Sequence, residues 1–254
     1  MRRGNRPRVS AMDAVSWAQG VVQAGTRGVS GSDPLVVTHQ LGHTAHVVNA
    51  GWPVTRTERA RAAQLASRQH GQAHLAGRAI VRSVIAAADD RRPDSVILDV
   101  DATAKPYALE TRISFNISHT SGLVACAFLY GNAVGVDVER RDRTISADLG
   151  DLARRVCGPD EARALTNLET GGINRERFIR AWTRKEAVTK ATGDGLRLDP
   201  RTVVVIAAGA DGERDVEVVV ANGQHWCCWT SATDDDCFLS VAWPARLRGA
   251  VSGG

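Results

Sequence analysis

Apolar residues recur at helical spacing over residues 57–88, where no proline interrupts the chain. Leu65, Ala73, Ile80 and Val84 would share one face of such a helix, so the pattern predicts one long helix there. Shorter apolar runs bounded by turn residues predict strands instead. These predicted strands cover 35–37, 45–48, 96–100, 113–117, 123–129 and 134–139.

The second part of the chain repeats this order. Helical patterns cover 146–156, 161–168 and 175–192, and strand patterns cover 203–206, 216–220, 226–230 and 238–243. A long helix followed by strands, found twice, predicts an α+β fold with two similar halves, each a long helix packed on a mostly antiparallel sheet. We assign residues 35–134 to the N-terminal half and 135–248 to the C-terminal half, and we expect 1–34 to be a disordered basic tail.

Composition places the chain among ordinary globular proteins. Apolar residues make up 43% and charged residues 24% of it. No apolar run approaches the roughly 20 residues of a membrane span, so we expect no membrane partner. The five cysteines show no Cys-x-x-Cys pair, which disfavours a disulfide framework or a zinc ribbon and favours the reducing cytoplasm.

The net charge is concentrated at one end. Lysine plus arginine is 32 and aspartate plus glutamate is 28, which leaves +4, and Arg2, Arg3, Arg6 and Arg8 account for all of it. A nucleic-acid binder needs positive charge over a folded face, so we expect no nucleic-acid partner. Only three basic residues are lysines, namely Lys105, Lys185 and Lys190. An ammonium group and a guanidinium are not interchangeable at a phosphate or a titrating site, so these three positions are candidates for a functional role. The alternative is that these lysines are chance remnants.

Asp137 and Glu139 are candidate metal ligands. They lie two residues apart in a predicted strand, so both carboxylates leave the same face. Two carboxylates so close repel each other, which favours a hard cation between them that prefers oxygen ligands, magnesium above all. The alternative is an exposed strand end, solvated or paired with Arg140.

A helix near residue 186 carries a second candidate group. Trp182, Glu186 and Lys190 are spaced i, i+4 and i+8 and share one face, with Lys185 at its margin. A carboxylate beside two ammonium groups suits a site that binds metal and phosphate. An ordinary surface pair between Glu186 and Lys190, worth only about 0.3–0.5 kcal/mol, is the alternative.

Ser118 and His119 end a predicted strand and form a third candidate group. A hydroxyl and an imidazole there can donate hydrogen bonds to phosphate oxygens in a cleft. The alternative is a histidine satisfied by the backbone. The chain has no Gly-x-Ser-x-Gly motif, so Ser118 is not expected to be an acyl-type nucleophile.

Together these motifs resemble a known family. The runs 134–139, 182–190 and 193–196, with Lys105-Pro106 and 115–119 upstream, resemble the 4′-phosphopantetheinyl transferase superfamily, in particular its larger, surfactin-synthetase-activating (Sfp-type) branch. The resemblance spans about Leu35 to Trp243. It implies a pseudo-dimeric monomer whose two halves are related by pseudo-two-fold symmetry.

The resemblance also implies ligands. Asp137, Glu139 and Glu186 would hold magnesium together with the pyrophosphate of coenzyme A, and Lys190 would contact that pyrophosphate with Lys185 close by. The remaining coenzyme contacts would be Ser118 and His119 at the phosphates, with His119 at the 3′-phosphate, Lys105 and Pro106 at the adenine, and Arg59 or Arg61 at the 3′-phosphate. Ala104 replaces the glycine usual before Lys-Pro, which predicts a different backbone shape in that loop.

The implied reaction transfers 4′-phosphopantetheine from coenzyme A to a serine of an acyl or peptidyl carrier protein, a transient partner. Asp137, Glu186 and Lys190 would be catalytic, with Glu186 taking the serine proton directly or through a metal-bound water. One alternative is another magnesium-dependent phosphotransferase, although the chain has no GxxxxGK[ST] loop. Another is a non-catalytic module that binds coenzyme A or carrier protein.

Overall fold

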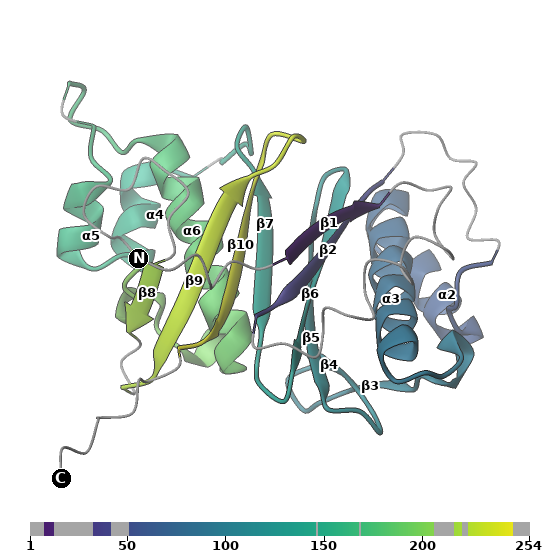
Figure 1. Ribbon diagram of the computed structural model, residues 1–254. Helices are drawn as coiled ribbons and strands as arrows, with labels where there is room; N and C mark the ends of the chain where they lie inside the picture. Colours follow the sequence, from purple (N-terminus) through teal and green to yellow (C-terminus); the bar gives the residue numbers. More distant parts are fainter. Residues whose placement is uncertain are drawn as a thin grey trace, which may run out of the picture.

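The computed structural model describes residues 8–12, 33–41, 51–145, 147–167, 169–205, 216–219 and 223–245. The predicted strand at 45–48 lies outside these residues. Two four-stranded sheets form the centre of the molecule (Figure 1). The N-terminal sheet has the order β1 (Arg8–Met12), β2 (Leu35–Gln40), β6 (Leu123–Tyr130), β5 (Ile113–Thr120), and the C-terminal sheet has the order β7 (Gly135–Arg140), β10 (Cys237–Pro244), β9 (His225–Ala232), β8 (Val216–Val219).

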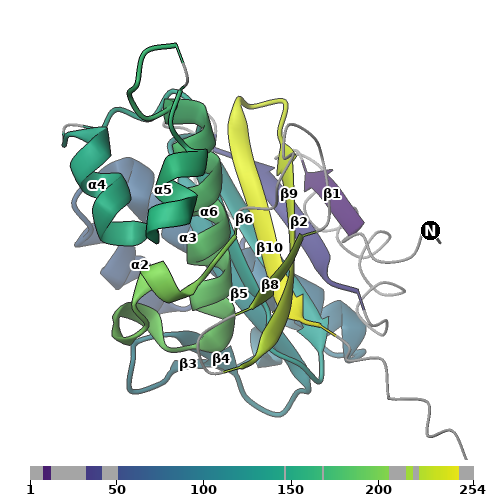
Figure 2. The same cartoon turned by 90° about the vertical axis from the view of Figure 1, so that its left-hand side faces the viewer.

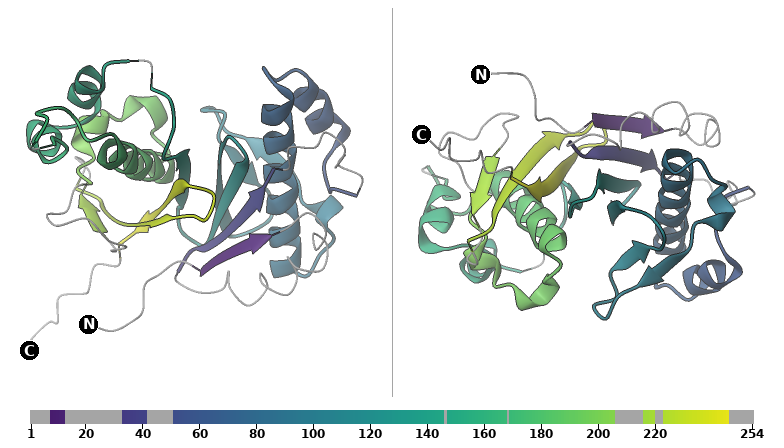
Figure 3. Two further views of the ribbon diagram at one scale, coloured as in Figure 1. Left: turned by 90° about the horizontal axis from the view of Figure 1, so that it is seen from above. Right: turned by 60° about the horizontal axis from the view of Figure 1, so that its bottom comes forward.

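Helices cover the outer face of each sheet. α2 (Arg56–Ala63) and α3 (Arg68–Ala88) lie on the N-terminal side, and α4 (Leu149–Val156), α5 (Pro159–Ala164) and α6 (Arg175–Thr192) lie on the C-terminal side (Figure 2). Seen from above, α3 and α6 stand on opposite outer sides of the two sheets (Figure 3). No described helix is long and apolar enough to cross a membrane.

Three apolar cores hold these layers together. One lies between α3 and the N-terminal sheet, around Ile80 and Phe128, and another between α6 and the C-terminal sheet, around Phe178 and Val188. The third lies between the sheets and includes Val136. The predicted α+β architecture is therefore confirmed, whereas a pseudo-two-fold axis stays a prediction.

Both sheets are largely antiparallel, as expected for each half. The exception is β1, which pairs in parallel with β2 along the register Arg8↔Leu35 to Met12↔His39. Arg8–Met12, part of the segment 1–34 that we expect to be disordered, thus forms a strand in the structure. An extended segment beside an open strand edge gains main-chain hydrogen bonds, which local composition does not reveal.

The predicted single helix over 57–88 is divided into α2 and α3. Thr55 and Glu58 form a capping box at the start of α2, and the Ser67 hydroxyl accepts the His70 N–H at 3.2 Å to start α3. A Cβ at Gly71 would lie 2.7 Å from the Ala62 carbonyl oxygen, so glycine lets the two helices meet closely.

Smaller elements connect the layers. η1 (Pro93–Ser95) precedes a hairpin of β3 (Leu98–Val100) and β4 (Pro106–Ala108), and η2 (Gly195–Arg197) and η3 (Pro200–Thr202) follow α6. The predicted strand at 203–206 does not form over 203–205, because the Val205 N–H donates to Glu161 Oε1 at 2.8 Å instead of joining a ladder.

The seam between the two sheets is made by side chains. Val136 N–H donates to Asn116 Oδ1 at 3.0 Å, and Val138 N–H donates to Ser118 Oγ at 3.3 Å. Two buried residues of β5 thus satisfy the backbone of β7, with Asp137 between the two bonded amides. This seam positions the candidate site.

Gly135 permits the close packing of β7 on α6. A Cβ at this position would lie 2.5 Å from the Ala191 nitrogen and still nearer to the Ala187 carbonyl oxygen. Gly135→Ala is therefore expected to lower the free energy of unfolding by at least about 2 kcal/mol, measured by chemical denaturation. Gly172→Ala is the control, because its nearest atom would be Thr170 Oγ1 at 3.7 Å. Equal stability of the two variants would contradict the close packing.

Candidate active site

A pocket of about 330 Å³ opens where β5, β7 and α6 meet. We call it the seam pocket. It is lined by Ile117, Ser118, His119, Asp137, Val138, Glu139, Arg143, Trp182, Glu186 and Lys190. Six of the predicted site residues therefore lie together, and they come from both halves of one chain.

Local periodicity directs most of these side chains inward. Asp137 and Glu139 share one face of β7, and Trp182, Glu186 and Lys190 share one face of α6, so both predicted faces line the pocket. α6 is long enough to present its whole face because Asn174 caps its first turn and Gly193, at φ +79°, ends it in the left-handed region.

An ion pair inside the pocket is linked to the N-terminal half through the Ser118 hydroxyl. Lys190 Nζ donates to Asp137 Oδ1 at 2.6 Å and to Ser118 Oγ at 3.1 Å. The Ser118 hydroxyl also donates to Asp137 Oδ1, at 2.8 Å. Asp137 is 4% exposed, and its Oδ2 is buried without a hydrogen-bond partner. The site thus holds one carboxylate oxygen free to accept a ligand.

The two glutamates of the pocket have raised pKa values. Burial is the main cause for Glu139, and the nearby charge of Asp137 raises its pKa further. Burial and Asp137 likewise raise the pKa of Glu186, while Lys190 and Arg143 oppose the increase. Both carboxylates therefore take up protons more readily than a solvated glutamate does.

Arg143 is a pocket residue that the sequence analysis missed. It forms an ion pair with Glu139, whereas Arg140, the partner considered from the sequence, pairs with Asp142 at 2.6 Å. The signal in the sequence that could have identified Arg143 was its i, i+4 spacing from Glu139, although Arg143 lies past the end of β7. Trp182 also hydrogen-bonds Glu139 through its side chain.

Arginine and histidine side chains of α2 and α3 interact with one another and with His119, which lines the pocket. We call this group the cation patch; it comprises Arg61, His70, His74, Arg78 and His119. The rings of His70 and His119 lie 5.7 Å apart, and His74 Nε2 is buried without a hydrogen-bond partner. His70 and His74 were missed, although their i, i+4 spacing on a predicted helix was the available signal.

Two imidazoles of the cation patch, His74 and His119, have lowered pKa values. Desolvation lowers the pKa of His74 most, and Arg78, Arg61 and His119 lower it further, whereas Glu58 opposes the decrease. The pKa of His119 is lowered by desolvation and then by His70 and Lys190, although its side chain is exposed at the rim. The positive neighbours of these imidazoles favour an anion there.

The two predicted arginines differ in position. Arg59 is exposed, and its Nη2 donates to the Trp52 carbonyl oxygen at 3.4 Å. Arg61 acts electrostatically on His74 and so belongs to the cation patch.

Lys105 reaches the edge of the site without lining it. Its half-buried ammonium donates to the Lys190 carbonyl oxygen at 2.5 Å, and burial lowers its pKa. Pro106 follows as the first residue of β4. Ala104 has φ +62°, in the left-handed region that favours glycine, so the alanine keeps a glycine-like backbone with strain.

Lys185 does not reach the seam pocket. Its ammonium is buried and donates to Glu161 Oε2 at 2.6 Å and to the Pro200 carbonyl oxygen at 3.0 Å. The structure therefore places Lys185 apart from the pocket that gathers the other predicted phosphate-binding residues. A residue at the margin of a helix face turns toward whichever element packs there, and here α5 occupies that side.

Among the residues that the structure describes, no three His, Cys, Asp or Glu side chains are gathered so as to hold a metal ion. Lys190 and Arg143 instead partner Asp137 and Glu139.

Comparisons with known proteins identify the family. A model of the 4′-phosphopantetheinyl transferase superfamily matches residues 133–241, which include the seam-pocket residues of β7 and α6. The chain is also 32% identical over 189 residues to the 4′-phosphopantetheinyl transferase HetI of Nostoc sp., a match that covers 73% of this chain and 76% of that protein. This chain belongs to the 4′-phosphopantetheinyl transferase superfamily.

Further relatives of this superfamily are more distant. The chain is 27% identical to a phosphopantetheinyl transferase of Thraustochytrium sp., over 69% of each protein. It is 28% identical to the L-aminoadipate-semialdehyde dehydrogenase-phosphopantetheinyl transferase of Xenopus laevis, over 49% of this chain and 44% of that protein. The predicted resemblance to the superfamily is thereby confirmed, and the protein is an enzyme of the phosphopantetheinyl transferase type.

Proposed function

We propose that this transferase moves 4′-phosphopantetheine from coenzyme A to a serine hydroxyl of an acyl or peptidyl carrier protein and belongs to the larger, Sfp-type branch. The observation that carries this is the Asp137–Lys190 pair in a pocket that also presents Glu139, Glu186 and His119. Paired positive and negative groups at one cleft suit a pyrophosphate with its counter-ion. Both halves contribute to the pocket, which supports a monomer as the active unit. Five free cysteines support a reducing compartment such as the cytoplasm.

The proposed reaction is displacement at phosphorus. The serine oxygen bonds to the pyrophosphate phosphorus that carries pantetheine, the bond to the bridging oxygen breaks, and adenosine 3′,5′-bisphosphate leaves with the electron pair. Lys190 stabilises the charge on the phosphates, because its ammonium lies in the pocket beside Asp137. Glu186 accepts the serine proton, and its raised pKa makes it a stronger base than a solvated carboxylate.

Asp137, Glu139 and Glu186 would hold the magnesium ion. All three line the same pocket and offer the oxygen ligands that magnesium prefers. Asp137 Oδ2, buried without a partner, fits a ligand oxygen. When bound, the ion would neutralise pyrophosphate charge.

The coenzyme's other groups would lie along the edges of the pocket. Ser118 and His119 would contact phosphate oxygens, and Lys105 with Pro106 would border the adenine. The cation patch would bind the 3′-phosphate, with Arg61 rather than Arg59 as its arginine, because Arg61 acts on His74.

This placement predicts how donor choice depends on pH. The lowered pKa values leave His74 and His119 neutral in the free enzyme near neutrality, and a bound phosphate dianion favours their protonated forms. Binding therefore raises both pKa values, and affinity for the 3′-phosphate falls as pH rises through them. The preference for coenzyme A over dephospho-coenzyme A, taken from Kd values, should be at least roughly threefold larger at about pH 6.5 than at about pH 8.

Two variants serve as controls for the pH effect. His74→Asn should flatten the pH dependence, and Arg61→Gln should reduce the preference at every pH. A preference that does not change with pH in the parent would remove the imidazoles from the 3′-phosphate site.

Mass spectrometry tests the proposed function directly. An apo carrier protein incubated with this enzyme, coenzyme A and magnesium should gain the mass of 4′-phosphopantetheine on its serine. Chelation of the magnesium should prevent the gain. Binding of coenzyme A and carrier without any mass change, with several carriers, would instead indicate a non-catalytic binding module.

A further inference from the structure

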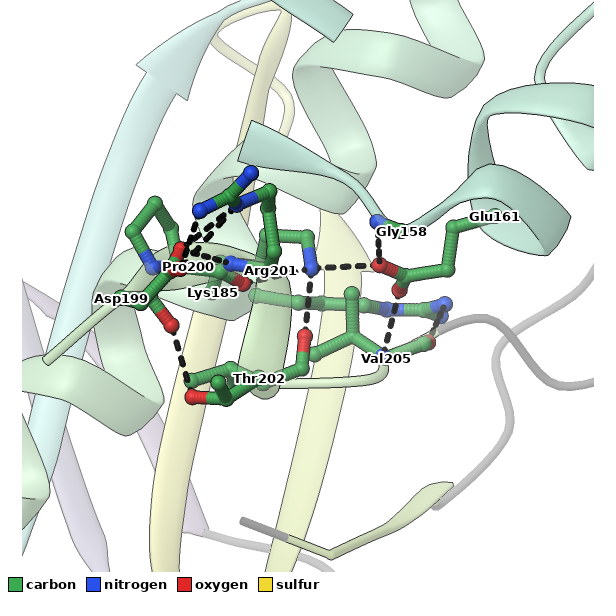
Figure 4. Close-up of polar contacts among 10 residues, drawn as sticks. Gly158, Glu161, Lys185, Asp199, Pro200, Arg201, Thr202 and Val205 are labelled. Atoms are coloured by element: carbon green, nitrogen blue, oxygen red, sulfur yellow. Dashed lines mark hydrogen bonds and ion pairs between the residues drawn. The ribbon is translucent and has the colours of Figure 1, made fainter. Parts of the chain in front are cut away.

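Lys185 is among the most buried charged groups of the molecule. Its side chain is 2% exposed, yet the ammonium is fully bonded inside the C-terminal half (Figure 4). It donates to Glu161 Oε2 and to the carbonyl oxygens of Pro200 and Val203. Three donors and three acceptors leave no N–H of the ammonium for a ligand.

Both carboxylate oxygens of Glu161 also accept hydrogen bonds within the protein. Its Oε2 accepts from Lys185 and, at 3.4 Å, from the N–H of Gly158 at the start of α5, and its Oε1 accepts from the Val205 N–H at 2.8 Å. The Glu161 side chain is 4% exposed. This ion pair therefore ties three segments to one point: α5, α6 and the stretch 200–205 that follows η2.

The position of Lys185 on α6 connects this ion pair to the seam pocket. Consecutive residues of a helix point about 100° apart, so a lysine fixed toward α5 sets the direction of the next residue, Glu186. Lys190 lies one helical turn after Glu186, so the same rotation of α6 also sets the direction of its side chain. Arg184 also anchors α6, because its Nε donates to Thr230 Oγ1 of β9 at 2.9 Å.

We propose that Lys185 is a positioning residue, whose buried ion pair with Glu161 fixes the rotation of α6 so that Glu186 and Lys190 face the pyrophosphate. This inference rests on the proposed transfer reaction. It replaces a contact between Lys185 and the coenzyme with an action through the helix.

A charged pair specifies one arrangement better than apolar packing does. A Lys185–Glu161 pair has a single geometry that satisfies both charges, and any other rotation of α6 leaves a buried charge without its partner. Apolar residues of the same size tolerate neighbouring rotations, because their contacts have no direction. The lysine at this position in an arginine-rich chain is consistent with a compact ammonium meeting three acceptors.

The test compares Lys185→Met with the double variant Lys185→Met/Glu161→Gln. The single variant leaves the Glu161 carboxylate buried without a counter-ion and should have the lowest Tm. The double variant removes both charges, so its Tm should recover most of the way to the parent's. Its kcat for transfer should nevertheless stay at least about tenfold below the parent's with KM for coenzyme A within about twofold, since α6 has lost its rotational anchor.

Hydrogen–deuterium exchange gives a readout that does not depend on transfer. Peptides covering 182–192 should exchange faster in the double variant, while peptides from β5 and β6 keep the parent rate. The matched control is Asp160→Asn/Arg163→Met, which removes an exposed ion pair of α5 at 2.9 Å without touching α6. This control should match the parent in Tm, kcat and exchange.

The outcomes separate the possible roles of Lys185. Parent-like kcat and exchange in the double variant would overturn the proposal and leave the pair with a role in stability alone. A raised KM with unchanged kcat would overturn it in favour of contact with the coenzyme. Absence of transfer by the parent enzyme would refute the proposed function, and faster exchange of 182–192 would then still support the anchoring of α6.

Discussion

Replacing Asp137 with asparagine is expected to lower kcat/KM for phosphopantetheine transfer by roughly 10²–10³-fold. The substitution keeps the shape of the side chain and removes its charge. Asp137 is where the two halves of the site meet, since its Oδ1 binds both Lys190 and Ser118 and its Oδ2 is the buried oxygen without a partner. Steady-state transfer assays at saturating magnesium measure the loss.

The same substitution should lower Tm by roughly a few degrees, because the half-buried Lys190 ammonium loses its counter-ion. Asp142→Asn is the control. Asp142 follows the end of β7, is exposed, and pairs with Arg140. Activity of Asp137→Asn within about fivefold of the parent, with the control unchanged, would exclude Asp137 from the reaction.

Removing the Lys190 ammonium is expected to have the next largest effect. Lys190→Met should lower kcat/KM by roughly 10²-fold, because no other described ammonium group lines the seam pocket. Lys190→Arg keeps the charge but should still lose about tenfold in kcat/KM. A guanidinium is larger than an ammonium group and holds its N–H groups in one plane, so it does not reproduce the contacts of Lys190 Nζ with Asp137 Oδ1 at 2.6 Å and Ser118 Oγ at 3.1 Å.

The arginine variant separates chemistry from stability. Its Tm should remain nearer to the parent's than that of Lys190→Met, which leaves the buried Asp137 carboxylate without its ammonium. If Lys190→Arg shows kinetics within twofold of the parent, Lys190 serves only as a surface ion pair. Isothermal titration of each variant with coenzyme A distinguishes weaker binding from slower transfer.

The proposed site draws on both halves of the chain. Ser118 and His119, the proposed phosphate contacts, come from β5, whereas Asp137 and Lys190 come from β7 and α6. Side chains of Asn116 and Ser118 satisfy the backbone of β7 where a strand ladder would otherwise run. Any rearrangement of this seam would therefore disturb both the sheet edge and the site.

The sequence by itself determined the features that depend on local periodicity. Alternation along a strand placed Asp137 and Glu139 on one face, and helical spacing did the same for Trp182, Glu186 and Lys190. The α+β class followed from the order of these patterns, and the paired motifs pointed to the superfamily that the comparisons established. Each of these properties is encoded in local patterns or in their order along the chain.

Tertiary structure alone decided which partner each ambiguous side chain meets. Lys185 lies at the margin of the α6 face, and only the packing of α5 turned it inward to Glu161. His70 and His74 became neighbours of the site because α3 lies against the end of β5, where His119 approaches His70. Periodicity fixes the face on which a residue lies, whereas the element that packs against that face is chosen by contacts distant in sequence.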